Sequence, residues 1–128
     1  MATLEKKKAV ERKEKRANGP VRASLRNLNM SARKIRVIAD GIRNQSLGHA
    51  FAFLSTQKKA CCGPLKKLLE SLAANADARN LDIDTCTIAQ IRVDKGPLRK
   101  RFMPRAQGRA TKIRKQTAHI EVVLSTNS

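Results

Sequence analysis

Residues 95–115 read KGPLRKRFMPRAQGRATKIRK, and this stretch decides the fold of the chain. It contains no Asp or Glu, two prolines, two glycines and few large apolar side chains, so it has too little to bury for a core of its own. Pro104 and Gly108 indicate a turn between two extended limbs. We therefore predict a protruding β-hairpin of basic residues over about 90–118, with its tip at about 104–110.

The segments on both sides of this stretch have the composition of β-strands. Residues 85–93 are rich in β-branched side chains, and apolar residues alternate at Ile120, Val122 and Leu124. Alternation with a period of two is typical of a strand with one buried face. We expect segments 85–93 and 117–124 to pair antiparallel and to continue past the sheet into the hairpin.

Toward the N-terminus, the sequence predicts one more strand and three helices. Residues 21–28 alternate as a short strand does. Helix-spaced apolar residues follow Ser31 and Ser46, which are both predicted N-caps. A third helical pattern has Gly63 and Pro64 near its start, so this helix begins at about Pro64 or begins earlier and is kinked there. The predicted fold class is α+β, with three helices packed on a small three-stranded antiparallel sheet and a long protruding basic β-hairpin.

Positive charge is concentrated in two segments. The chain of 128 residues has 28 Lys and Arg against 10 Asp and Glu, which gives a formal net charge of +18. Residues 1–36 and residues 92–115 each carry a net charge of +9, whereas residues 37–91 carry +1. A domain this basic is typical of nucleic-acid binding. Because the chain has no Trp, no Tyr and only three Phe, we expect contacts to phosphates rather than stacking on bases.

Residues 1–19 form a separate segment. They contain two runs of Lys and Arg without an apolar stripe. The segment ends in Asn18, Gly19 and Pro20, which are typical of a turn or loop. We expect a basic tail that is disordered without RNA, followed by a single α+β RNA-binding domain over residues 20–126. A sharper interpretation of the same segment is an arm that becomes ordered on an RNA surface.

The sequence lacks the motifs of catalysis and metal binding. Cys61 and Cys62 do not have the spacing of a zinc site, and three cysteines do not form a disulfide framework. No phosphate-binding glycine loop, nucleophile motif or metal triad is present. We therefore predict that the chain is not an enzyme and binds no metal or cofactor. No apolar stretch is long enough for a signal peptide or a membrane span, so we expect a reducing, soluble compartment.

Several motifs resemble those of one ribosomal family. They are SARKIRVIADGIR at 31–43, LESLAANA at 69–76, VDKGP at 93–97, PRAQGRA at 104–110 and IRKQTAHI at 113–120. Together they resemble the large-subunit ribosomal protein twenty-two family, in its bacterial or organellar form, over roughly residues 22–124. The chain departs from the family pattern at Gln107, where a basic residue is common, and at Gly63-Pro64.

The resemblance implies a structural constituent of the large ribosomal subunit, in the cytoplasm or in an organelle. Such a protein binds large-subunit rRNA, supports its assembly and lines the nascent-peptide exit tunnel with its hairpin. Its implied partners are the rRNA, neighbouring large-subunit proteins and the nascent peptide. The candidate rRNA-binding residues are Arg22, Arg26, Arg33, Lys34, Arg36, Lys95, Arg99, Lys100, Arg101, Arg105, Arg109, Lys112, Arg114, Lys115 and His119. The candidate tunnel-lining residues at the tip are Arg105, Ala106, Gln107, Gly108, Arg109 and Ala110.

The net positive charge, taken alone, is also compatible with two other functions. A free RNA chaperone or DNA-compacting protein would use the same cations at many loose sites, without dependence on the hairpin sequence beyond its charge. A membrane-surface or antimicrobial protein would need a basic amphipathic helix with a wide apolar face. The basic segments here contain few Leu, Ile and aromatic residues, which disfavours the membrane alternative.

Overall fold

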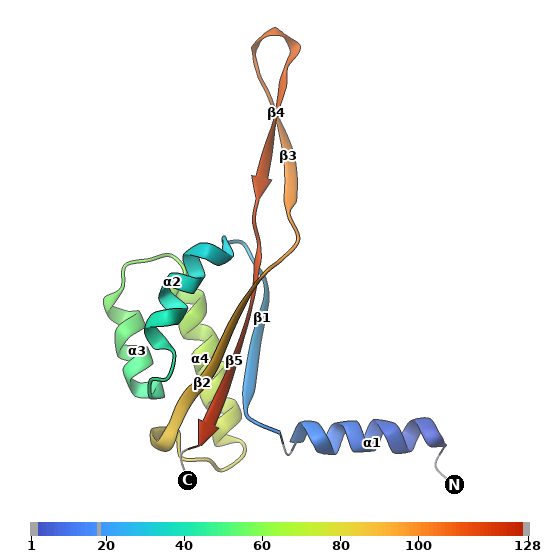
Figure 1. Cartoon of the computed structure of the whole chain (residues 1–128), viewed down its shortest axis with the longest axis vertical. Coiled ribbons are helices and arrows are strands. Elements are labelled where there is room, and N and C mark those ends of the chain that lie inside the picture. The colour runs from blue at the N-terminus through green and yellow to red at the C-terminus, as the bar shows by residue number, and fades with distance from the viewer. Residues whose placement is uncertain (1–2, 18, 127–128) are drawn as a thin grey trace.

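A computed structural model describes residues 3–17 and 19–126, so residues 1, 2 and 18 of the predicted tail lie outside the described residues. The order of helices and strands is α1 (Leu4–Ala17), β1 (Arg22–Leu28), α2 (Ala32–Ile42), α3 (Leu47–Thr56), α4 (Cys62–Asp77), β2 (Cys86–Lys95), β3 (Arg99–Pro104), β4 (Ala110–Lys115) and β5 (Ala118–Thr126). Figure 1 shows a body from which the β3–β4 hairpin and helix α1 protrude at opposite ends of the sheet. The α+β class is confirmed, with α1 as a fourth helix in the segment expected to be a tail.

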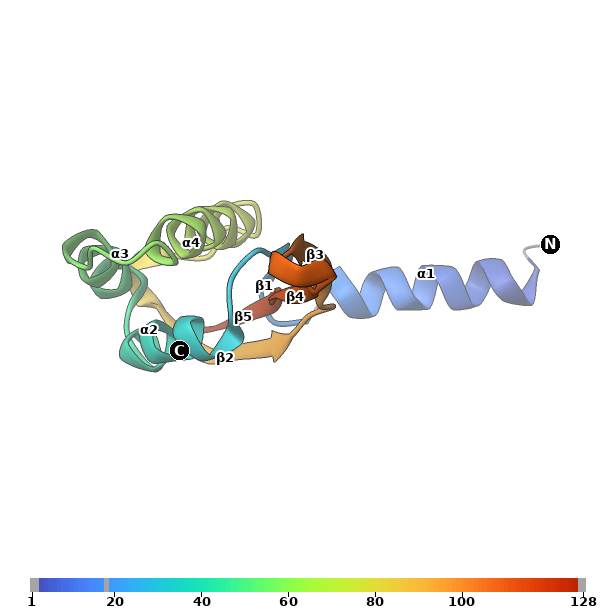
Figure 2. The same cartoon turned by 90° about the horizontal axis from the view of Figure 1, so that it is seen from above.

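Three antiparallel strands form the sheet of the body, in the order β1-β5-β2. Ile120 of the central strand lies opposite Leu25 on one side and Val93 on the other. Along β5 the buried residues alternate, as the period of two in the sequence predicts. Helices α2, α3 and α4 lie on the same side of this sheet (Figure 2), and the core fills the space between the two layers.

Each body helix faces the core with residues spaced by three and four. In α4, the side chains of Leu65, Leu69 and Leu72 are fully buried. In α2, Ile35 and Ile42 are fully buried on the side that faces the sheet. Apolar stripes of this spacing bury one side of a helix and leave the other to polar residues.

The first residues of the three body helices test the predicted helix starts. The Ser46 hydroxyl accepts a hydrogen bond from the backbone N–H of His49 at 3.4 Å, so this N-cap is confirmed. Ser31 is the N-cap residue of α2, as predicted, and has an extended conformation, but its hydroxyl makes no cap hydrogen bond. Helix α4 begins at Cys62 and continues through Pro64. Pro64 lies in the first turn of α4, where backbone N–H groups have no helical partner, so the N–H that proline lacks costs the helix no hydrogen bond.

Strands β2 and β5 lead into the hairpin, but the pairing is interrupted at the junction. Residues 96–98 and 116–117 separate the body sheet from the two-stranded sheet of β3 and β4. The backbone N–H of Gly96 donates to the carbonyl of Thr117 at 2.8 Å, and the Thr117 hydroxyl donates to the carbonyl of Pro97 at 2.6 Å. A Cβ atom on Gly96 would lie 2.4 Å from Thr117 Oγ1, so only glycine fits this close approach.

Candidate RNA interface

The hairpin, residues 99–115, has no core of its own. Its strands pair in register from Arg99 opposite Lys115 to Pro104 opposite Ala110. Every residue of the two strands is exposed except Ile113, which is half-buried. An isolated two-stranded hairpin is marginally stable in water, so the order of this one depends on what surrounds it.

Cations lie on both faces of the hairpin. Residues directly opposite each other share a face, and successive residues of a strand alternate between faces. One face therefore carries Arg99, Arg101 and Lys115, and the other carries Lys100, Lys112 and Arg114. The first two cross-strand pairs each join two like charges, which destabilises a free hairpin. This arrangement fits an anionic partner that surrounds the hairpin better than one that contacts a single face.

The tip is a tight loop closed by one backbone hydrogen bond. The N–H of Arg105 donates to the carbonyl of Arg109 at 2.7 Å. Gln107 and Gly108 have φ values of 62° and 68°, in the left-handed region that glycine adopts without strain. The turn falls within residues 104–110, the predicted tip, and all of these side chains are exposed.

The open face of the sheet carries a mixture of charges. Arg26 and His119, two of the predicted rRNA-binding residues, line a shallow hollow together with Asp94 and Glu121. Arg92 forms ion pairs with both of these acids, at 3.7 and 3.8 Å. An RNA phosphate on this face would meet two carboxylates. We therefore expect Arg26 and His119 to attract phosphate less strongly than the predicted contacts that lie away from acids.

Two predicted rRNA-binding residues have structural hydrogen bonds. The Arg36 guanidinium on α2 donates to the carbonyl of Val93 from Nε at 3.1 Å and from Nη2 at 2.8 Å. The Nδ1 atom of His119 accepts from the backbone N–H of Asn27 at 3.1 Å, where β1 is irregular. Arg36 therefore ties helix α2 to strand β2, and His119 ties strand β5 to strand β1, roles that sequence spacing alone did not indicate.

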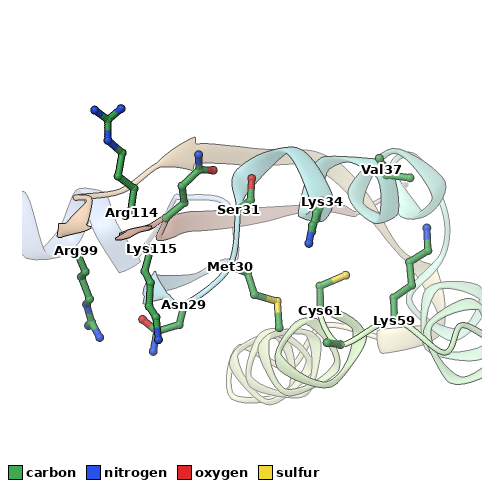
Figure 3. Close-up of a pocket in the computed structure, with 12 residues that line it drawn as sticks. Asn29, Met30, Ser31, Lys34, Val37, Lys59, Cys61, Arg99, Arg114 and Lys115 are labelled. Atoms are coloured by element: carbon green, nitrogen blue, oxygen red, sulfur yellow. The ribbon is translucent and has the colours of Figure 1, made fainter. Parts of the chain in front are cut away.

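The base of the hairpin, the start of α2 and the loop before α4 enclose a groove of about 1080 Å³. The groove contains five cations and no acid among its lining residues; the cations are Lys34, Lys59, Arg99, Arg114 and Lys115. Figure 3 shows that Arg99 and Lys115 point toward the side on which Met30 and Cys61 lie, whereas Arg114 points the other way. The fold thus brings hairpin and helix cations together at one concave place.

Lys59 is a groove residue that sequence reasoning missed. It follows Lys58 in the loop between α3 and α4, where no motif or periodicity distinguishes it from a solvated lysine. The structure brings it together with Lys34 and the base of the hairpin as residues that line the same groove.

The remaining predicted residues are distributed over the same part of the chain. Arg22 is exposed on β1, Arg33 is exposed on α2, and Lys95 ends β2 opposite Ala118. The ion pairs of Arg43 with Asp40 and of Arg92 with Asp94 and Glu121 involve no cation of the hairpin or the groove.

The described part of the chain contains no group of three or more His, Cys, Asp or Glu side chains placed to hold a metal ion. Burial raises the pKa of the Cys61 thiol, with the neighbouring Cys62 adding to the effect, and burial also raises the pKa of Cys86. Thiols in this state are poor nucleophiles. Among residues 3–17 and 19–126, no helix is long and apolar enough to cross a membrane.

Comparison with known proteins connects this geometry to a family. The family model described as ribosomal protein L22p/L17e matches residues 23–125. A large ribosomal subunit protein uL22 from Myxococcus xanthus is 46% identical over 106 residues, which cover 80% of this chain and 93% of that protein. The protein of the same name from Bdellovibrio bacteriovorus is 45% identical over 105 residues, covering 81% and 96%. That of Desulfosudis oleivorans is 42% identical, covering 82% and 92%.

The matched residues include the body, the groove and the whole hairpin, whereas helix α1 lies before them. The family is structural and non-enzymatic, which agrees with the absence of a catalytic motif from the sequence. The chain therefore belongs to the ribosomal protein uL22 family and is a structural constituent of the large ribosomal subunit.

Proposed function

We propose that the chain binds large-subunit rRNA mainly through its hairpin and the groove at the hairpin base, supports the packing of that rRNA during assembly, and lines the nascent-peptide exit tunnel with its tip. The observation that carries this proposal is the placement of three cations on each face of the hairpin, with no acid between Lys95 and Gln116. Crowded phosphates from several RNA helices repel one another, and cations inserted between them reduce this repulsion.

The predicted contact residues fall into two groups under this proposal. The hairpin cations and Lys34 bind phosphate, because they are exposed and lie away from acids. Arg36 and His119 act mainly within the fold, because Nε and Nη2 of Arg36 and Nδ1 of His119 already have backbone partners. Neighbouring large-subunit proteins are expected partners of the body, and the bacterial origin of the similar proteins favours a cytoplasmic ribosome.

A scrambled hairpin tests whether sequence as well as charge matters. The order of residues 99–115 is permuted with composition and net charge unchanged, while Gly96 and Thr117 are left in place. Tagged chains are then sedimented with ribosomes on a sucrose gradient before and after a high-salt wash. We expect the parent to remain on the large subunit at one copy per particle and the scramble to be lost. A binder with six to ten simple phosphate contacts loses on the order of 10³–10⁵ in affinity between 50 and 200 mM salt. Equal retention of the scramble would contradict a role for the hairpin sequence beyond its charge, and loss of both chains in the wash would favour a free RNA chaperone.

A pair of charge reversals tests the tunnel role separately. Arg105→Glu reverses one charge at the tip, and Lys112→Glu makes the same change of charge on strand β4. We expect Arg105→Glu to alter ribosome stalling on nascent chains with normal subunit assembly, and Lys112→Glu to impair assembly. Ribosome profiling together with gradient profiles distinguishes the two effects. Unchanged stalling with impaired assembly in Arg105→Glu would contradict the tunnel role.

A further inference from the structure

The groove at the hairpin base has two kinds of lining. Its lining residues include five cations, here called the rim, and several apolar side chains, here called the floor, among them Met30, Val37 and Cys61. Val37 is 58% exposed, although it lies on a helix whose other large aliphatic side chains are buried. A surface that met only the phosphates of an RNA duplex would gain nothing from an exposed valine, because phosphates and sugars are polar.

The polar groups around this floor can recognise the edge of a base. Asn29, Ser31 and Gln116 also line the groove, and the Ser31 hydroxyl makes no cap hydrogen bond to α2. Amide and hydroxyl side chains both donate and accept hydrogen bonds. Arg99 points into the same side of the groove as Met30 (Figure 3), and a guanidinium plane can stack on a base.

We propose that the groove binds one unpaired nucleotide of the large-subunit rRNA, with its base on the floor of Met30 and Val37 and its phosphates on the surrounding cations. This inference rests on the proposed function, since it names the part of the RNA that the same interface takes. An extruded nucleotide is anionic at one end and flat and weakly polar at the other. The groove is cationic at its rim and apolar at its floor, and its volume of about 1080 Å³ accommodates a ligand of that size.

The test uses the full chain and two RNA probes. One probe is a fluorescein-labelled RNA duplex with a single-nucleotide bulge at its centre, and the other is the same duplex fully paired. The measured quantity is the ratio of the two dissociation constants, obtained by fluorescence anisotropy at fixed salt. We expect the parent chain to bind the bulged probe about tenfold more tightly, which corresponds to about 1.4 kcal/mol of binding free energy.

A matched pair of uncharged substitutions tests the floor. Val37→Gln places a polar group in the groove, and Val10→Gln makes the same change at the exposed valine of α1. We expect Val37→Gln to bring the ratio close to one without weakening binding of the paired probe, and Val10→Gln to leave the ratio unchanged. Because both valines are exposed, both variants should fold, which circular dichroism checks. A parent chain that does not distinguish the probes, or a Val37→Gln chain that still does, overturns the inference.

A matched pair of lysine substitutions tests the rim. Lys59→Gln removes a lining cation, and Lys58→Gln removes the same charge from the adjacent residue, which does not line the groove. We expect a lower ratio for Lys59→Gln than for Lys58→Gln, and equal ratios would count against a phosphate contact at the rim. Lys112→Gln on the hairpin should weaken binding of both probes equally. If it weakens neither, the proposed hairpin function fails instead, so the two failures are distinguishable.

Discussion

Leu69 in the body and Phe102 in the hairpin are both large apolar side chains, yet the first is fully buried and the second is 66% exposed. The body is held together by burial of apolar area, and its segment from 37 to 91 is almost neutral. The hairpin buries almost nothing and carries cations on both faces. The difference predicts that one chain contains a region that folds for itself and a region whose order depends on its partner.

The largest effect should come from truncating the two apolar side chains in parallel. Leu69→Ala leaves a cavity in the core and should lower the free energy of unfolding by about 3 kcal/mol. Phe102→Ala should change it by less than about 0.5 kcal/mol, because the side chain is mostly exposed. Urea denaturation of the free protein measures both. Comparable losses would mean that the hairpin is part of the cooperative core.

The contact between Gly96 and Thr117, where the body meets the hairpin, should contribute to the free energy of unfolding. Gly96→Ala forces a Cβ atom against Thr117 Oγ1, and we expect the free energy of unfolding to fall by about 2 kcal/mol. Thr117→Ala removes the hydrogen bond to the Pro97 carbonyl and should cost about 1 kcal/mol. The double variant should lose less than the sum of the two, because the alanine at 117 removes the clash. Additive losses in urea denaturation would show that this contact does not fix the junction.

Two arginines of α2 distinguish a cation that stabilises the body from one that is expected to bind RNA. Arg36→Met removes two hydrogen bonds to the Val93 carbonyl and should lower the free energy of unfolding by about 1.5 kcal/mol. Arg33→Met removes an exposed cation and should leave stability within about 0.5 kcal/mol while weakening RNA binding. Thermal unfolding and RNA titration of both variants test this pair. The expectation fails if Arg33→Met destabilises the fold as much as Arg36→Met.

The smallest effect should appear in alkaline solution. Because burial raises the pKa of Cys61 and Cys86 in the folded chain, the folded state holds these protons more tightly than the unfolded state does. Stability should therefore fall slightly as the pH rises above about 8.5, the ordinary pKa of a thiol. The same burial should make both thiols react slowly with iodoacetamide until urea unfolds the chain. Rapid alkylation in the native state would show that this side of the body opens readily.

The elements of the body were predictable because their signals are local. The alternation at Ile120, Val122 and Leu124 lies within β5, and the apolar spacing from Leu65 to Ala76 lies within α4. A period of two or of 3.6 residues can be read within a few residues of sequence. The class of the fold and the position of the hairpin follow from such patterns.

The remaining features depend on contacts between residues far apart in the chain. Arg36 bonds to a carbonyl 57 residues away, and the interruption of the strands depends on Thr117 meeting Gly96. Lys59 lines the groove together with residues of α2 and the hairpin. Helix α1 was missed for another reason, because a segment without an apolar face has no periodic signal that separates a helix from a disordered tail. Whether this segment is ordered without RNA stays a prediction.

The exposed hairpin has a consequence for the lifetime of the chain. Each of its lysines and arginines precedes a peptide bond that trypsin-like proteases recognise, and the loop at 105–109 is an exposed tip of the kind that is cut first. Only a partner wrapped around both faces would hide all of these bonds. We therefore expect a copy without a bound partner to be cut by such proteases sooner than a copy whose hairpin is covered, so that excess chain would be removed by degradation.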